Sequence, residues 1–193
     1  MQKLYIASAL LLALGAAAQA PPAQTPAQPA SPSTLAQSLE QPLSIAEKEF
    51  VSAAEAMPEE KYEFVPAQGE FKGVRTFAQQ VKHVAAANYG LGGFVLGEKP
   101  PVDMSNMNGP DAIKTKADIL KFLKDSYAYA HKAVASISEQ NATKPEKSPF
   151  GSGNTTRLAM ATFAVAHTFD HYGQIVVYLR MNGIVPPASR KQD

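Results

Sequence analysis

The chain has 193 residues, of which 45% are hydrophobic and 18% charged, a balance typical of a single globular domain. Its 18 basic and 17 acidic side chains leave a formal net charge of +1, so there is no basic field to attract nucleic acid, and we expect no nucleic-acid partner. The sequence contains no cysteine, which excludes disulfides, thiolate metal ligands and cysteine nucleophiles. Any metal ion must therefore be bound by His, Asp or Glu.

Residues 1–20 carry the three parts of a secretory signal peptide. Lys3 precedes an uncharged run from Leu4 to Ala18, and the run closes on Ala18-Gln19-Ala20, an A-x-A cleavage pattern. The run is shorter than the ~20 apolar residues that a membrane-spanning helix needs. We therefore predict cleavage after Ala20 and a periplasmic or secreted protein with no stable membrane span.

The next segment, residues 21–43, repeats proline among Ala, Gln and Ser. Such a composition offers few large side chains to bury, so it predicts a disordered linker. The globular part is expected over residues 44–187, followed by a short C-terminal tail at 188–193. No internal repeat of solenoid length is visible.

Four helices are expected in the globular part. Ser44 and Glu47 match a capping box at the start of the first helix, and Pro58 ends that helix. Thr76 and Gln79 match a second capping box, which opens a helix with an apolar stripe of Phe77, Val81, Val84, Leu91 and Val95.

A third helical pattern covers residues 118–137. The fourth follows a turn-rich segment, with Asn154 or Thr155 as its cap, and stops at Asn182-Gly183 before Pro186-Pro187. Few alternating β-branched runs occur. The sequence therefore predicts an all-α fold, a four-helix bundle.

The last helix carries a candidate metal site. His167 and His171 stand four positions apart, so both imidazoles project from the same face, together with Met160, Ala164, Gln174 and Tyr178. Neutral imidazole is a common ligand for zinc, nickel, iron and copper. A third ligand is needed, and His83, at the border of the apolar stripe of the second helix, is the candidate. His131 is held in reserve, and the alternative is that these are ordinary, hydrogen-bonded core histidines.

The residues around the histidine pair narrow the chemistry. Thr168 stands where the H-E-x-x-H motif of zincin proteases has its general-base Glu, which argues against that class. Asp170 points about 100° away from His171. We therefore expect its carboxylate to be solvated, or to contact a metal ligand without binding the metal itself. Gln174 and Tyr178 could orient substrate or water, or serve in packing. The sequence identifies no catalytic base.

Three stretches carry a family resemblance: AMPEEKYEFVPA, FAQQVKHVAAANY and AHTFDHYGQIVVYLRMNGIVPP. In this order and spacing, residues 44–187 resemble the DinB/YfiT-like superfamily of metalloenzymes. The resemblance rests most on H-x-x-x-H-x-G-Q, followed by Y-L-R and G-x-x-P-P. It implies an up-down-down-up four-helix bundle and a site of three histidines for a divalent transition metal (zinc, nickel or iron), mapped onto His83, His167 and His171.

The resemblance leaves the reaction open. Some members of the superfamily are transferases or isomerases that use low-molecular-weight thiols, but an exported protein is separated from the cytosolic thiol pool. We therefore expect a metal-dependent hydrolase or transferase acting on an unknown small molecule. The alternatives are a metal-holding or ligand-binding bundle without turnover, and an interaction protein without a metal. A homodimer is compatible with the sequence, which does not specify an oligomeric state.

Overall fold

Four helices make up most of the computed structural model, which describes residues 33–191. They are α1 (Leu35–Ala56), α2 (Phe77–Leu96), α3 (Lys116–Ala135) and α4 (Arg157–Met181). The connections contain two single-turn 3-10 helices, η1 (Glu59–Lys61) and η2 (Pro187–Ser189), and a small hairpin of β1 (Glu146–Lys147) and β2 (Asn154–Thr155). These two strands are antiparallel, with Glu146 opposite Thr155. The predicted signal peptide and the first part of the predicted linker, residues 21–32, lie outside the described residues.

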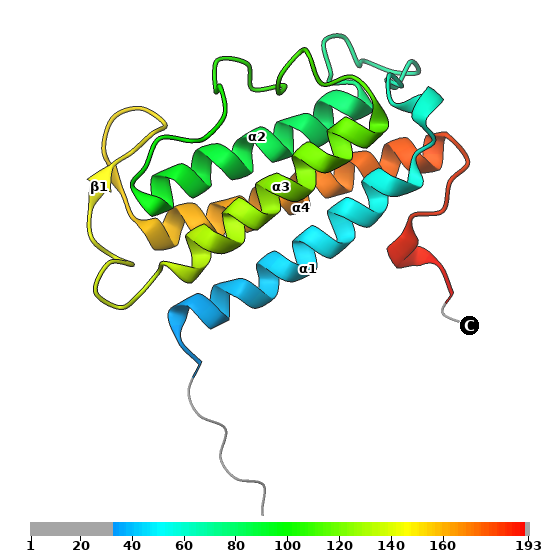
Figure 1. Ribbon diagram of the computed structural model, residues 1–193. Helices are drawn as coiled ribbons and strands as arrows, with labels where there is room; N and C mark the ends of the chain where they lie inside the picture. The colour runs from blue at the N-terminus through cyan, green and yellow to red at the C-terminus, as the bar shows by residue number, and fades with distance from the viewer. Residues whose placement is uncertain (1–32, 192–193) are drawn as a thin grey trace, which may run out of the picture. The chain divides into compact units, whose positions relative to one another are not determined.

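The helices form the bundle that the sequence predicts. In Figure 1, α1 and α4 run in one direction along the bundle, and α2 and α3 run in the other, which is the up-down-down-up order. Both α1 and α2 pack against α3 and α4. Because α2 and α3 are parallel, the chain must return along the bundle between them, and residues 97–115 make this crossover as a long loop (Figure 1).

The predicted start of the first helix was wrong. The helix begins nine residues before Ser44, at Leu35, and is capped by Thr34 and Gln37, which bond to each other's backbone N–H at 2.9 and 3.2 Å. Residues 35–43 are therefore helical and not a disordered linker. The reason is an apolar stripe of Leu35, Leu39 and Leu43 at intervals of four residues, which packs on the core. Burial of these leucines offsets the entropy lost when the segment becomes helical.

The other helix ends agree more closely with the sequence. Thr76 caps α2 through the predicted capping box with Gln79. The cap of α4 is Thr156, one or two residues later than predicted, because Asn154 and Thr155 pair with β1. At the C-terminal end of α4, Gly183 has φ 73°, a left-handed conformation that suits glycine and confirms the predicted stop.

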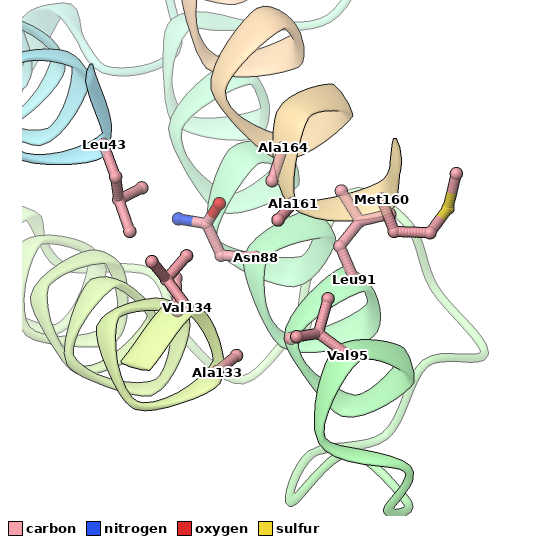
Figure 2. Close-up of a pocket in the computed structure, with 11 residues that line it drawn as sticks. Leu43, Asn88, Leu91, Val95, Ala133, Val134, Met160, Ala161 and Ala164 are labelled. Carbon is pink, nitrogen blue, oxygen red and sulfur yellow. The ribbon is translucent and has the colours of Figure 1, made fainter. Parts of the chain in front are cut away.

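The core between the helices is mostly apolar, and Asn88 and Ser126 place a buried polar pair within it. Figure 2 shows the Asn88 amide among apolar side chains that include Leu43, Leu91 and Val134. The amide nitrogen donates a hydrogen bond to Oγ of Ser126 at 3.2 Å. The cavity beside it holds about 10 Å³, room for about one water molecule and no ligand. Within residues 33–191, no helix is both long enough and apolar enough to span a membrane.

Candidate metal centre

His83, His167 and His171 meet between α2 and α4. His83 lies in the middle of α2, and the other two lie one turn apart on α4. The three imidazole ring centres are 4.5 to 5.0 Å apart. Each ring offers a nitrogen atom, and these three atoms all lie within 4.8 Å of one another. The structure thus brings together the three residues that the sequence singled out.

The spacing of the nitrogen atoms fits one shared ion. Two ligand nitrogens on a tetrahedral zinc ion, with bonds of ~2.05 Å, lie about 3.3 Å apart. Nε2 of His83 and Nε2 of His167 are 3.2 Å apart. Among the described residues, the group contains no carboxylate, so the donor set is three imidazoles. This set could hold a divalent transition ion and would leave a coordination position open.

A chain of hydrogen bonds fixes the orientation of His171. The carboxylate of Asp170 accepts from Nε2 of Gln174 at 3.3 Å, and Oε1 of Gln174 accepts from Nε2 of Gln80 at 2.8 Å. Oε1 of Gln80 then lies 2.6 Å from Nδ1 of His171. Because a carboxylate can only accept, the polarity of this chain places a proton on Nδ1 of His171. Its Nε2 is then left with a free lone pair, the form that binds a metal.

The crossover loop fixes His83 in the same way. The backbone oxygen of Met107 lies 2.6 Å from Nδ1 of His83. A carbonyl oxygen only accepts, so Nδ1 of His83 carries the proton and Nε2 faces His167 with its lone pair. Two of the three imidazoles are therefore held in the metal-binding tautomer by partners outside the cluster.

All three imidazoles are held in the neutral form. Burial lowers the pKa of His83 below its ordinary value, despite the opposing hydrogen bond to Met107. Burial, together with the neighbouring His83, lowers the pKa of His167 to about 4. Burial and the other two histidines lower the pKa of His171 to about 3. At neutral pH no proton competes with a metal ion for these nitrogen atoms.

His131, the reserve ligand, lies elsewhere. It faces α1, where its Nε2 is 2.8 Å from Glu47 and its Nδ1 is 2.7 Å from Glu40. Only the contact with Glu47 has hydrogen-bond geometry, so the contact with Glu40 is an ion-pair contact alone. Burial lowers the pKa of His131, but the two carboxylates outweigh it and the pKa is raised above its ordinary value. His131 fastens α3 to α1 and takes no part in the cluster.

The remaining candidates on α4 support the site or the fold. Gln174 and Asp170 belong to the hydrogen-bond chain that reaches His171. Tyr178 donates from its hydroxyl to the backbone oxygen of Arg75 at 3.0 Å and packs edge-on against Phe64. Thr168 is buried and donates to the backbone oxygen of Ala164 at 3.1 Å, so it supplies no acid or base.

Two partners of the cluster were missed in the sequence. Gln80 precedes His83 by three residues and therefore lies on the same face of α2, a signal that could have identified it. The backbone oxygen of Met107 gave no such signal, because every residue of the crossover loop has a carbonyl group. Its role follows only from the path of the loop.

A cavity of about 420 Å³ adjoins the cluster and reaches His83 and His167. Its volume lies within the ~300–1,000 Å³ of typical small-molecule sites. It lies between α2, α4, the crossover loop and the turn after β1, and its walls include Met104, Met107, Phe150 and Phe163. The open side of the histidine group is therefore accessible to a small molecule.

The comparisons with known proteins agree with the four-helix fold. The family model of the DinB superfamily matches residues 43–175. A DinB-like protein from Bacillus cereus ATCC 10987 superimposes with a TM-score of 0.62 at 15% identity, covering 77% of this chain and 93% of that one. A DinB-like protein from Bacillus subtilis gives 0.60 at 14% identity, covering 80% and 99%. No curated protein sequence matches significantly. With the family match over most of the bundle and the same fold in both solved structures, the chain belongs to the DinB superfamily.

Proposed function

We propose that this protein is an exported metal-dependent enzyme, a hydrolase or transferase that acts on a small molecule. His83, His167 and His171 would hold one divalent transition ion, such as zinc, nickel or iron. The observation that carries the proposal is the convergence of three neutral imidazoles, two of them with Nδ1 tied to a fixed acceptor 2.6 Å away. A histidine with a purely structural role does not need a fixed acceptor at Nδ1, whereas a metal ligand needs one to keep its Nε2 lone pair free.

The ion, the groups that orient its ligands and the cavity walls would each contribute to the chemistry of such a site. When bound, a divalent ion on three neutral ligands keeps its charge, acidifies a bound water molecule and polarises a carbonyl group. Gln80 and the Met107 carbonyl orient the imidazoles of His171 and His83 and hold the proton on Nδ1, so that Nε2 would be free to bind the ion. The apolar walls of the cavity lower the local dielectric beside the histidines, which strengthens electrostatic interactions there.

Metal analysis tests the metal site. The protein, purified without an affinity tag, should contain about one divalent ion per chain, by the one-site geometry. His167→Ala and His171→Ala should reduce this content to near zero. His131→Ala is the matched control and should leave it unchanged, because His131 contacts only the carboxylates of α1. A near-zero content in the unaltered protein, even after incubation with zinc, would refute the site.

The second candidate is a bundle that binds a metal or small ligand without turnover. It is favoured by the walls of the 420 Å³ cavity, whose residues include no Asp, Glu, Lys or Tyr that could act as a general base. A screen of ester, amide and thioester substrates separates the two functions. Turnover that disappears in His167→Ala supports the enzyme, and metal binding without any turnover supports the second candidate.

Export rests on the predicted signal peptide. The proposal requires that the mature protein, recovered from the periplasm or the medium, begins at Pro21. Mass spectrometry of the intact protein decides this, and a cytoplasmic protein that keeps residues 1–20 would refute it. Export would also remove the protein from the cytosolic thiols.

A further inference from the structure

The cavity beside the histidine cluster is almost entirely apolar. Its walls bring together residues of α2, the crossover loop, the turn after β1 and α4, among them Ala87, Leu91, Met104, Met107, Phe150 and Phe163. The imidazoles of His83 and His167 are the only polar side chains among its lining residues. A ligand in this cavity can therefore form strong polar interactions only at the end where the histidines lie.

The contrast with a neighbouring cavity sharpens this point. A second cavity, of about 320 Å³, is lined by polar groups that include Arg75, Gln80, Asn108 and Gln174, but by none of the three histidines. The side of the cluster that opens to the larger cavity is thus the apolar side. The polar groups of a phosphate or a sugar that lay along these walls would lose their hydration without gaining hydrogen-bond partners, which disfavours such ligands.

The mouth of the apolar cavity exposes aromatic and methionine side chains. Phe150 is 65% exposed, and Phe163 and Met107 are each 42% exposed. The rings of Phe150 and Phe163 meet edge to face at 5.7 Å, and the ring of Phe163 lies 5.7 Å from that of His167. These residues come from three separate segments, so they form one apolar wall that leads to the histidines. Exposed apolar surface around a concave site is typical of ligand-binding sites.

We propose that the ligand of this site has an uncharged, apolar body, an alkyl chain or an aromatic ring, and one metal-coordinating oxygen head group. The body lies against Phe150, Phe163 and the two methionines, and the head group reaches the open side of the histidine cluster. This inference rests on the proposed function, since the head group needs the metal ion. Flexible methionine side chains would adjust to bodies of different shape.

A series of alkyl hydroxamates tests the inference on the zinc-loaded protein. Acetohydroxamate, butanohydroxamate and octanohydroxamate share one head group and differ only in apolar length. Because each buried methylene contributes about fourfold in affinity, the dissociation constant measured by calorimetry should fall by more than tenfold from the first to the second probe and again to the third. Equal affinities along the series would overturn the inference.

Two phenylalanines of α4 provide a matched pair of variants. Phe163→Ala should weaken octanohydroxamate binding at least about fivefold, as expected for lost apolar contact, and should weaken it more than acetohydroxamate binding. Phe169, 36% exposed on the same helix but outside the cavity walls, is the control, and Phe169→Ala should change neither. Phe150→Ser, in an exposed turn where folding is not at stake, should act like Phe163→Ala.

The outcomes separate this inference from the proposed function. A protein that binds zinc but shows no dependence on chain length retains the metal site and overturns the apolar ligand. A protein that binds no zinc overturns both. Weakening by Phe169→Ala equal to that by Phe163→Ala would also overturn the inference, since the effect would then not arise in the cavity.

Discussion

Gln80 joins the hydrogen-bond chain to His171 of the proposed metal site, and its replacement gives the sharpest test of the geometry. Gln80 is 2% exposed, and its Oε1 accepts from Nδ1 of His171 at 2.6 Å. In Gln80→Leu, the side chain keeps a similar volume but offers no acceptor. The His171 ring would then be free to rotate and to place its proton on either nitrogen.

The expected loss is a 10- to 100-fold weaker zinc affinity, the usual effect of removing an outer partner of a histidine ligand. This corresponds to about 1.4 to 2.8 kcal/mol of binding free energy. Competition with a chromogenic chelator at pH 7 measures the affinity directly. Thermal unfolding of the metal-free variant, in the presence of EDTA, shows whether the fold is retained.

Gln80→Glu is the matched control, because a carboxylate is a stronger acceptor for Nδ1–H than an amide oxygen. This variant should retain the zinc affinity or raise it, although Gln174 loses its donor from residue 80. A zinc affinity of Gln80→Leu within twofold of the unaltered protein would refute the role of the chain. An equal loss in both variants would show that packing, and not the acceptor, is responsible.

Three further predictions follow from the structure. The metal-free protein should lose stability as the pH falls from 6.5 towards 4. The reason is that the unfolded histidines take up protons that folded His167 (pKa about 4) and His171 (pKa about 3) do not. A melting temperature that falls as steeply with pH in His171→Asn would contradict this. The pKa of His131 is raised, so its contribution is present below pH 6.5 and lost as the pH rises through its folded pKa; His131→Ala should therefore speed amide exchange in residues 35–47 more at pH 6 than at pH 9. Gly109→Ala should lower the melting temperature and the zinc affinity, because φ of Gly109 is 78° and the new Cβ would lie 2.7 Å from Cβ of Lys82. Gly73→Ala is the control. Its φ is 81°, but no atom lies within 4 Å of the new Cβ, so the zinc affinity should be unchanged.

The helix starts show how far local signals carry. Both Ser44-Glu47 and Thr76-Gln79 match the capping-box pattern, but only the second is used. Ser44 lies inside α1 and its hydroxyl donates to Glu40 at 3.3 Å. The pattern predicts a helix start only where the preceding residues are not already helical. Here the apolar stripe of Leu35, Leu39 and Leu43 stabilises a helix that begins upstream and continues past Pro42. The composition of residues 21–43 concealed that stripe, because prolines, alanines and glutamines dominate the segment.

The candidate site was more predictable than its supports. The spacing of His167 and His171 places both on one face of a helix. The border of the apolar stripe on the second helix pointed to His83 as the third member, and the family resemblance maps onto the same residue. Neither argument predicts which residues of other segments form hydrogen bonds with the imidazoles. Asp170 and Gln174 were recognised as neighbours of the pair, but their link to His171 passes through Gln80 on another helix. Contacts between distant segments depend on how helices pack, which the spacing along one helix does not encode.

The three histidines are not equivalent, and the difference has a chemical consequence. Nε2 of His83 and Nε2 of His167 are 3.2 Å apart, so a hydrogen bond between them requires one proton. Since the proton of His83 is on Nδ1, facing the Met107 carbonyl, this proton belongs to His167. To hold a metal ion through Nε2, His167 would carry its proton on Nδ1 instead, whereas His83 and His171 already present free lone pairs at Nε2. His167 also lines the apolar cavity. His83 lines this cavity too, so both histidines of the 3.2 Å pair adjoin the proposed ligand site, and His171 does not.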